Sequence, residues 1–319
     1  MYTIVIRLLA VFLMVAAGVI ARRCKMLEGD TTSRLVALVT RIFYPALVYV
    51  TLVRTFTLGE LIHNWALPTG TALIMLTGFL VGLAVVTVGP FGDKGLARAF
   101  HFQCTINNYI FLPMPLILLY WGKAGVGLLV FSTVGSEVAV WTLGVIALTG
   151  GGVPWRQMVR RLVTMPMVAI AASLVTLLIR DGLDVNVLAS SRLGQSGNAL
   201  LDALELLGAA APPLAMVVAG SRMADLHPKH LWQPVQLALT VLRLVLIPAL
   251  ALLVLQLLPL EGEALAVLRV LAVMPSSIAS VMLSDLYHAD REFAASAVLL
   301  THVAALITIP IWLTYLGLS

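Results

Sequence analysis

Long apolar stretches are the feature that most constrains how this chain can fold. Ten of them are each long enough to cross a bilayer, because a spanning helix needs about 20 mostly apolar residues. Of the 319 residues, 61% are hydrophobic and 11% are charged, whereas a soluble domain has roughly 25% charged residues. The stretches cover residues 2–21, 34–54, 65–89, 96–119, 124–148, 157–180, 198–222, 231–257, 264–286 and 292–316. The sequence therefore predicts an all-α polytopic membrane protein with ten transmembrane helices, surrounded by the lipid bilayer.

The distribution of basic residues indicates membrane topology and excludes a nucleic-acid partner. Lysines and arginines are scattered between apolar stretches and form no basic stripe with interleaved aromatic residues. Most of them lie in the loops after the odd-numbered stretches, as at Arg22-Arg23 and Arg160-Arg161. The positive-inside rule then places these loops in the cytoplasm. Both termini are expected on the outer, periplasmic or extracellular, side of the plasma (inner) membrane.

The two cysteines predict neither a disulfide nor a metal site. Cys24 follows a basic pair in a short loop, and Cys104 lies inside an apolar stretch. Neither has an obvious partner or the spacing of metal ligands. We expect no cofactor and no metal.

Matching residues at a nearly constant spacing predict an internal repeat. The matches, at spacings of 167 or 168 residues, pair Pro45 with Pro213, Arg54 with Arg222, Asn108 with Pro275, and Leu119-Tyr120 with Leu286-Tyr287. They divide the chain into a first five-helix unit over residues 1–149 and a second over 156–319. Because five is odd, the second unit must enter the membrane from the opposite side, which is the inverted-repeat design of many secondary transporters.

Two stretches contain residues that interrupt a helix at mid-membrane. The fourth has Asn107-Asn108 followed by Pro113 and Pro115, and the ninth has Pro275-Ser276-Ser277. Proline removes an amide donor and clashes with the preceding turn, and Pro113 suits the first turn of a new half-helix. The two serines are expected to cap the half-helix that follows them. The alternative is that prolines only kink a helix, and this is our interpretation of Pro45, Pro166, Pro248 and Pro310.

Two such interruptions facing each other predict a binding site for an anion. Unpaired backbone groups persist at membrane depth only against protein or a polar cavity. The N-terminus of a half-helix presents free N–H groups and partial positive charge, which attract a carboxylate. The substrate-binding candidates are Asn107, Asn108, Pro113, Pro275, Ser276 and Ser277.

Three ionisable residues lie in the middle of apolar stretches, where charge is costly unless it has a partner or a task. Glu137 is in the fifth stretch, Arg243 in the eighth and His302 in the tenth. Glu137 and His302 occupy nearly equivalent positions of the two repeats, so they are candidates for a proton-coupling pair. The alternative is a static polar contact between helices. For Arg243 we consider three roles: substrate contact, neutralisation of Glu137, and an aliphatic stem that carries the charge to the interface.

The chain resembles the auxin efflux carrier family, whose bacterial members include malonate and malate carriers. The resemblance covers nearly the whole length and rests on a few motifs in a fixed order. These are Phe43-Tyr44-Pro45-Ala46-Leu47, Asn107-Asn108 with Pro113-Met114-Pro115-Leu116 and Trp121-Gly122, Pro213-Leu214-Ala215-Met216 with Gly220, and Pro275 with Leu286-Tyr287.

The resemblance implies a fold and a mode of movement. The fold is similar to that of bile acid and sodium symporters, with helices 1, 2, 6 and 7 as a scaffold and helices 3–5 and 8–10 as a mobile transport unit. It implies that Asn107, Asn108 and Pro275 hold the anionic substrate. Gly78, Gly82 and Gly89 are expected to allow close helix contact during the movement. A homodimer through the scaffold is also expected.

These observations predict an elevator-type secondary carrier for a small organic anion, coupled to protons. The first alternative is a sodium-coupled symporter of the bile-acid-symporter type, and the second is an anion channel. A channel would need helices that are polar along one face, whereas the polar residues here gather at mid-depth. Ser136 with His302 could serve an intramembrane enzyme, but no nucleophile elbow or aspartate pair accompanies them, so no catalytic residue is assigned.

Overall fold

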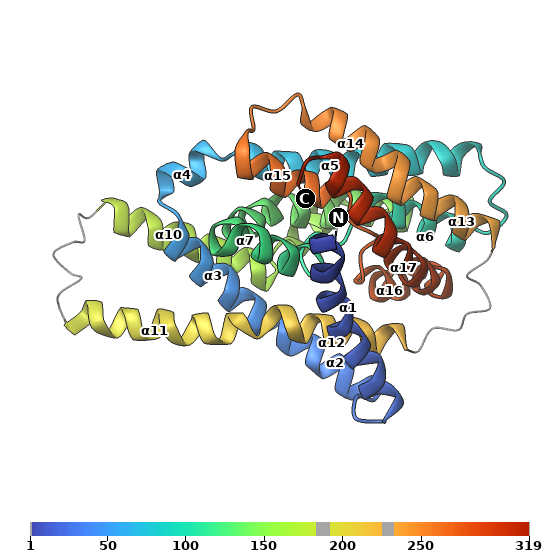
Figure 1. Ribbon diagram of the computed structural model, residues 1–319. Coiled ribbons are helices and arrows are strands. Elements are labelled where there is room, and N and C mark those ends of the chain that lie inside the picture. The colour runs from blue at the N-terminus through green and yellow to red at the C-terminus, as the bar shows by residue number, and fades with distance from the viewer. Residues whose placement is uncertain (1, 183–191, 225–232, 319) are drawn as a thin grey trace.

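The computed structural model describes residues 2–182, 192–224 and 233–318, and this part of the chain is almost entirely helical (Figure 1). Within it no strand is formed, and the only strand-like feature is an isolated bridge. The helices are α1 (Tyr2–Arg23), α2 (Gly29–Leu38), α3 (Tyr44–Thr55), α4 (Leu58–His63), α5 (Ala66–Val88), α6 (Lys94–Thr105), α7 (Pro113–Ala139), α8 (Val145–Thr149), α9 (Trp155–Arg161), α10 (Met165–Gly182), α11 (Arg192–Ala209), α12 (Ala211–Met223), α13 (Pro234–Val241), α14 (Ile247–Leu255), α15 (Gly262–Ala272), α16 (Ser280–Leu286) and α17 (Arg291–Tyr315).

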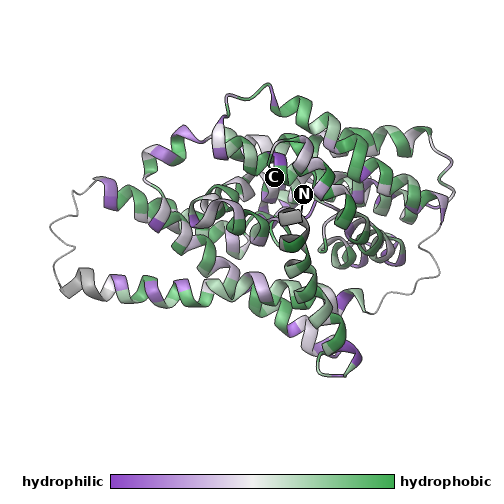
Figure 2. Ribbon diagram, viewed as in Figure 1, coloured by the Kyte–Doolittle hydropathy of each residue, from purple (hydrophilic) through white to green (hydrophobic). Residues whose placement is uncertain are grey.

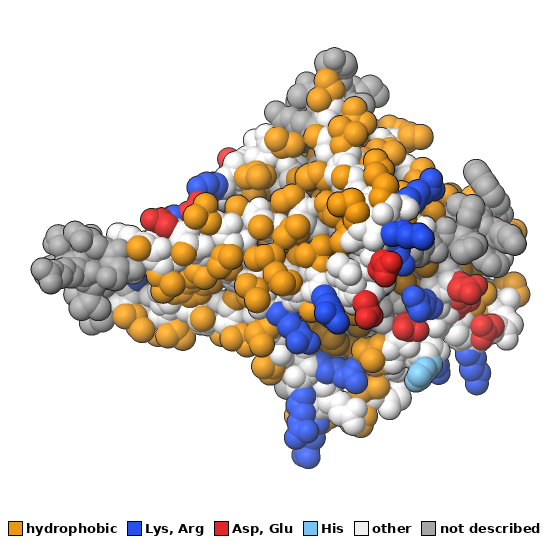
Figure 3. Space-filling view, turned by 90° about the horizontal axis from the view of Figure 1, so that it is seen from below, with side chains coloured by type: hydrophobic (Ala, Val, Ile, Leu, Met, Phe, Trp, Pro, Cys, Tyr) orange, Lys and Arg blue, Asp and Glu red, His pale blue; other side chains and the backbone are white. Residues whose placement is uncertain are grey.

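The composition of these helices is that of an all-α polytopic membrane protein. Six helical stretches of the described residues are long and apolar enough to cross a bilayer: Gly29–Thr55, Leu58–Val88, Pro113–Thr149, Gly197–Met223, Pro234–Leu255 and Arg291–Tyr315. Hydrophobic residues dominate the long helices (Figure 2). From below, hydrophobic side chains cover the middle of the face and most charged side chains gather toward one end (Figure 3).

The count of ten spans stays a prediction, because several expected spans are divided in the structure. The stretch over 96–119 contains α6 and the start of α7, and the stretch over 264–286 contains α15 and α16, each with a non-helical segment between the two helices. The stretch over 157–180 includes a turn between α9 and α10. Of the stretch over 231–257, residues 231–232 lie outside the described part.

The helices pack in two groups. In the first, α1 lies against α12, and α3 lies against α10 and α11. In the second, α5 contacts α6, α7, α14 and α15, and α17 contacts α6, α13 and α16. The two groups meet mainly where α3 packs against α7. This grouping places α6, α7, α15 and α16, which surround the two interruptions, together in the second group.

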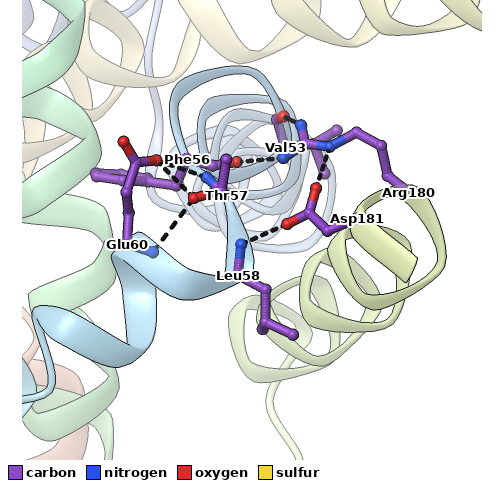
Figure 4. A network of polar contacts seen from close by, with 7 residues as sticks. All are labelled: Val53, Phe56, Thr57, Leu58, Glu60, Arg180 and Asp181. Atoms are coloured by element: carbon purple, nitrogen blue, oxygen red, sulfur yellow. Dashed lines mark hydrogen bonds and ion pairs between the residues drawn. The ribbon is translucent and has the colours of Figure 1, made fainter. Parts of the chain in front are cut away.

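Arg180 and Asp181, at the end of α10, hold the turn between α3 and α4 (Figure 4). Arg180 donates from Nη1 to the Val53 carbonyl and from Nη2 to the Phe56 carbonyl, both at 2.7 Å. Asp181 Oδ2 accepts from the Leu58 amide at 2.6 Å. A cation therefore satisfies carbonyls where α3 ends, and an anion satisfies an amide where α4 begins, as the helix dipoles favour.

Glycines allow α1 and α12 to touch backbone to backbone. A Cβ atom at Gly220 would lie 1.8 Å from the Val15 carbonyl oxygen, and one at Gly18 would lie 2.0 Å from that of Val217. Such contacts are impossible for any residue with a side chain. This is the small-residue packing by which membrane helices associate without a hydrophobic driving force.

The sequence predicted close helix contact at the glycines of α5, and the structure shows that α6 is the partner of Gly78 and Gly82. A Cβ atom at Gly78 would lie 2.1 Å from the Cys104 carbonyl oxygen, and one at Gly82 would lie 2.8 Å from the Cys104 Cβ atom. Gly89 instead ends α5 and faces the Val85 carbonyl of its own helix. The close contact therefore fixes α5 to α6 within one group and does not line a surface between the two groups.

Gly220→Ala should destabilise the protein by about 1 to 3 kcal/mol, because the added methyl group must push α1 and α12 apart. Thermal unfolding in detergent measures the effect. Gly59→Ala is the control, since nothing lies within 4 Å of a Cβ atom at Gly59. Equal melting temperatures for the two variants would contradict this description of the α1–α12 contact.

Candidate functional site

The two interrupted segments, residues 106–112 and 273–279, pair with each other and form a crossing. Residues 106–112 separate α6 from α7, and residues 273–279 separate α15 from α16. The Asn108 amide donates to the Pro275 carbonyl at 2.8 Å, and the Ser277 amide donates to the Ile106 carbonyl at 3.1 Å. Asn107 and Ser276 form an antiparallel bridge between these two bonds. Each segment thus supplies backbone partners that the other lost when its helix stopped.

The Asn108 side chain holds the turn that leads into the second half-helix of its own span. Its Oδ1 accepts from the amides of Phe111, at 3.2 Å, and Leu112, at 3.3 Å, just before α7 begins at Pro113. Pro113 therefore opens the new half-helix, as its sequence position predicted. The Asn108 Nδ2 group contacts His302 Nε2 at 3.1 Å. Both polar ends of this buried side chain are engaged within the protein.

Asn107 differs from its neighbour because one of its polar atoms has no protein partner. Its Nδ2 donates to the Leu271 carbonyl, in the last turn of α15, at 2.7 Å. Its Oδ1 is buried without a hydrogen-bond partner among the described residues, and the same holds for Oε1 of Gln103. Buried polar atoms normally have partners. These two amide oxygens are acceptors, so they suit a ligand group that carries a proton.

The serines after Pro275 form hydrogen bonds within the crossing and do not cap the following helix. Ser276 Oγ donates to the Gln103 carbonyl at 3.3 Å, near the end of α6. The half-helix α16 begins at Ser280, and no side chain caps it. The expectation that Ser276 and Ser277 cap this half-helix is wrong, because pairing with residues 106–108 holds them four and three residues before it starts.

Glu137 accepts three hydrogen bonds from three different parts of the chain. Oε1 accepts from the Tyr109 hydroxyl at 3.0 Å, and Oε2 accepts from the Trp141 indole and the Thr164 hydroxyl, each at 3.3 Å. Tyr109 belongs to the interrupted segment, whereas Thr164 precedes α10. An ionised carboxylate only accepts, so it matches three donors. The Glu137 carboxylate thus joins the crossing to the other group of helices.

His302 binds the crossing from α17, whereas Glu137 binds it from α7. Because Asn108 Oδ1 accepts two amides, its NH2 group faces His302 Nε2 and donates to it. The ring proton is then on Nδ1, which lies 2.8 Å from the Val298 carbonyl. His302 and Glu137 therefore bind consecutive residues of the crossing, Asn108 and Tyr109. The Ser136 hydroxyl, in turn, has no partner among the described residues, so it forms no nucleophile and base pair with His302.

Among the described residues, Arg243 donates to backbone carbonyls alone. The side chain is fully buried, and its guanidinium contacts the carbonyls of Cys104 and Met274. Cys104 lies in α6, which leads into the first segment of the crossing, and Met274 lies in the second segment. Neutralisation of Glu137 and a position at the membrane interface were two roles considered from the sequence. The structure shows neither, because the charge stays at the crossing and Glu137 has other partners.

The crossing is closed to solvent. The exposed fractions of Asn107, Asn108, Ser276 and Ser277 are 2%, 3%, 0% and 4%. A surface hollow of about 500 Å³ lies elsewhere, between α14, α15 and α17. It is lined by Ala249, Leu252, Leu253, Gln256, Arg269, Ile311, Trp312, Tyr315 and Leu316, which do not belong to the crossing. The four side chains at the crossing are therefore shielded from solvent in this conformation.

Sequence analysis missed the donors that surround Glu137. Trp141 follows Glu137 by four residues, the spacing that places two side chains on the same face of a helix, and this signal could have revealed it. Thr164 has no such signal, because only the tertiary fold brings it to α7. Among the described residues, no cluster of three or more His, Cys, Asp and Glu residues could hold a metal ion.

Asn108→Ala should destabilise the protein by about 1 to 3 kcal/mol, because the buried amides of Phe111 and Leu112 lose their acceptor. Thermal unfolding in detergent is the measurement. Asn64→Ala is the control, since Asn64 Nδ2 donates to the Glu60 carbonyl at an exposed position. An equal loss of stability in both variants would show that the Asn108 side chain has no special role in holding this turn.

Comparison with known proteins gives matches along the whole chain. The family described as "Membrane transport protein" matches residues 3–158 and 153–313. The "Uncharacterized transporter MJ1031" of Methanocaldococcus jannaschii is 24% identical over 311 residues, which cover 95% of this chain and 96% of that protein. "Protein PIN-LIKES 5" of Arabidopsis thaliana is 31% identical over 106 residues, which cover 33% of this chain and 26% of that protein.

Proposed function

Because the chain belongs to the membrane transport protein family, which includes the auxin efflux carriers, we propose that it is a secondary carrier for a small organic anion. One observation carries this proposal: two interrupted helices cross in the buried interior and present amide, hydroxyl and backbone groups there. Interrupted helices of this kind form the substrate sites of many secondary transporters. Their half-helix N-termini favour a carboxylate as the recognised group.

Two inverted repeats, over residues 1–149 and 156–319, are part of the proposal. The ends of the two interruptions support it: α6 ends at Thr105 and α15 at Ala272, 167 residues later, and α7 begins at Pro113 and α16 at Ser280, again 167 residues later. Asn108 and Pro275 are related by the same spacing, and they hydrogen-bond to each other. Residues at the axis of a two-fold repeat must meet in this way.

Movement of one helix group against the other would open the crossing alternately to the two sides of the membrane. In this elevator mechanism α1–α3 and α10–α12 form the scaffold, and α5–α8 with α13–α17 form the transport unit. The packing of the helices in two groups supports the division. Leu200 and Leu206 are exposed on the scaffold helix α11, where lipid or a second copy in a homodimer can cover them. The excess of basic residues in the odd-numbered loops supports cytoplasmic loops there and external termini.

Asn107 is the side chain that we assign to the substrate most directly. Its unpartnered Oδ1 can accept from the hydroxyl of a hydroxy acid or of a protonated carboxyl group. Asn108 and the backbone around Pro113 and Pro275 form the wall of the same site. Ser276 and Ser277 contribute through the pairing that holds the two segments together.

A thermal-shift screen of mono- and dicarboxylates tests the substrate class. A bound ligand raises the melting temperature in proportion to its affinity and concentration. We expect stabilisation of the wild type, little or none in Asn107→Ala and Asn108→Ala, and full stabilisation in Asn64→Ala. Saturable counterflow in proteoliposomes then distinguishes a carrier from an anion channel. If no carboxylate stabilises the wild type, or if both variants at the crossing retain full stabilisation, the site is misplaced.

Proton coupling is proposed to act through Glu137. A protonated Glu137 has one acceptor site fewer and gains a donor, so the hydrogen bond to the oxygen that takes up the proton is weakened. Thr164 is the partner from the scaffold side, and losing it would free the transport unit. His302 is a second candidate, because a proton on Nε2 would face the donor group of Asn108.

Glu137→Gln should remove the pH dependence of transport between about pH 5 and 8, because the amide cannot take up a proton in that range. Uptake or counterflow measured across this range checks the prediction. Glu263→Gln is the control, since Glu263 is an exposed acid at the start of α15. A pH profile that stays the same in Glu137→Gln would exclude this residue from coupling and leave a static contact.

A further inference from the structure

Arg243 is a completely buried cation whose hydrogen bonds go to the two interrupted helices. Its Nη1 donates to the Cys104 carbonyl at 2.9 Å, and its Nε and Nη2 donate to the Met274 carbonyl at 3.2 Å each. Its exposed fraction is 0%. Cys104 lies in the last turn of α6, and Met274 lies two residues after the end of α15. One guanidinium group therefore links the C-terminal ends of both half-helices.

Pro248 creates the helix distortion in which Arg243 sits. Proline has no N–H group and clashes with the carbonyl four residues earlier, here that of Leu244. The helix widens into a π-helical turn over Leu242–Leu246 before it continues as α14. The Leu244 carbonyl instead accepts from the Trp312 indole at 2.8 Å. The neighbouring helix α17 thus stabilises the distortion, and Arg243 lies within the distorted turn.

The electrostatics of the crossing require positive charge at this position. The C-terminal ends of α6 and α15 both carry partial negative charge from the helix dipole. Among the described residues, the polar contacts of Arg243 are to carbonyls and no carboxylate pairs with it. A buried charge without compensation is strongly unfavourable. The partial negative charges of the two helix ends therefore balance the positive charge of the guanidinium group, and its charge balances theirs.

The carbonyl ends of interrupted helices are also the ligands that sodium-coupled transporters offer to their ion. We propose that the Arg243 guanidinium is a built-in cation at the crossing, which takes the place of a bound monovalent cation. This inference deepens the proposed function, on which it rests, because it assigns the sodium position of the alternative symporter mechanism to a side chain. The carrier then runs without sodium, and the cation moves with the transport unit without being released.

The packing around the Cys104 carbonyl supports a fixed cation at this place. A Cβ atom at Gly78 would lie 2.1 Å from the Cys104 carbonyl oxygen, so α5 covers this oxygen on one side while Arg243 contacts it from another. The carbonyl cannot turn away from the guanidinium without displacing α5. The site is therefore shaped around a permanent occupant.

Thermal unfolding without substrate tests this inference separately from the transported anion. For the wild type, we expect the same melting temperature in sodium chloride and in choline chloride. Arg243→Ala should melt roughly 5 to 10 °C lower in choline chloride, because two helix ends lose their cation. Guanidinium chloride at about 10 mM, far below the molar concentrations that unfold proteins, should restore part of the loss. Arg269→Ala, on α15, is the control that should show neither the loss nor the rescue.

A second pair of variants covers the case in which Arg243→Ala does not fold. Arg243→Lys keeps the charge and Arg243→Met keeps an unbranched side chain without it, so the lysine variant should melt higher. Wild-type counterflow in proteoliposomes should proceed at equal rates in sodium and choline. Three results would each overturn the inference: wild-type melting or counterflow that requires sodium, equal melting of the lysine and methionine variants, or an Arg243→Ala protein that guanidinium does not stabilise. Failure to find a carboxylate substrate would instead affect only the proposed function.

Discussion

The structure depends on one constraint: an interrupted helix inside an apolar protein must find partners for the backbone groups that it leaves unpaired. Here two interrupted helices solve the problem together. Their segments pair as a short antiparallel bridge, and side chains complete what the bridge leaves open. Asn108 holds the turn before α7, whereas Asn107 and Arg243 bind the C-terminal ends of the half-helices. Removing any one of these groups leaves a buried polar atom without its partner.

The same side chains connect the crossing to helices that are distant in the sequence. Asn108 contacts His302 on α17, and Tyr109 donates to Glu137 on α7. Glu137 in turn accepts from Thr164, next to α10, in the other helix group. A movement of one group against the other must therefore exchange hydrogen bonds at the crossing. This is why a protonation event at Glu137 can act on the conformation of the whole protein under the proposed mechanism.

Close backbone packing holds each group together while these polar contacts join them. Gly18 and Gly220 bring α1 against α12 in the first group, and Gly78 brings α5 against α6 in the second. Contacts of this kind have no room for an added side chain. The two groups meet mainly where α3 packs against α7.

The sequence by itself determined the class of the protein, its family and the places where two helices stop. Apolar stretches of bilayer length require a membrane-embedded helical fold, and prolines near asparagines or serines mark where a helix cannot continue, so Pro113 was correctly placed at a helix start. Such signals are local in the chain. Tertiary structure alone decided the partners: that Asn108 meets His302, that Ser276 binds within the crossing, that Thr164 reaches Glu137, and that Arg243 binds two helix ends. These pairings join residues from separate helices, and neither hydropathy nor the spacing of side chains on one helix indicates which distant donor a buried acceptor will meet once the helices have packed.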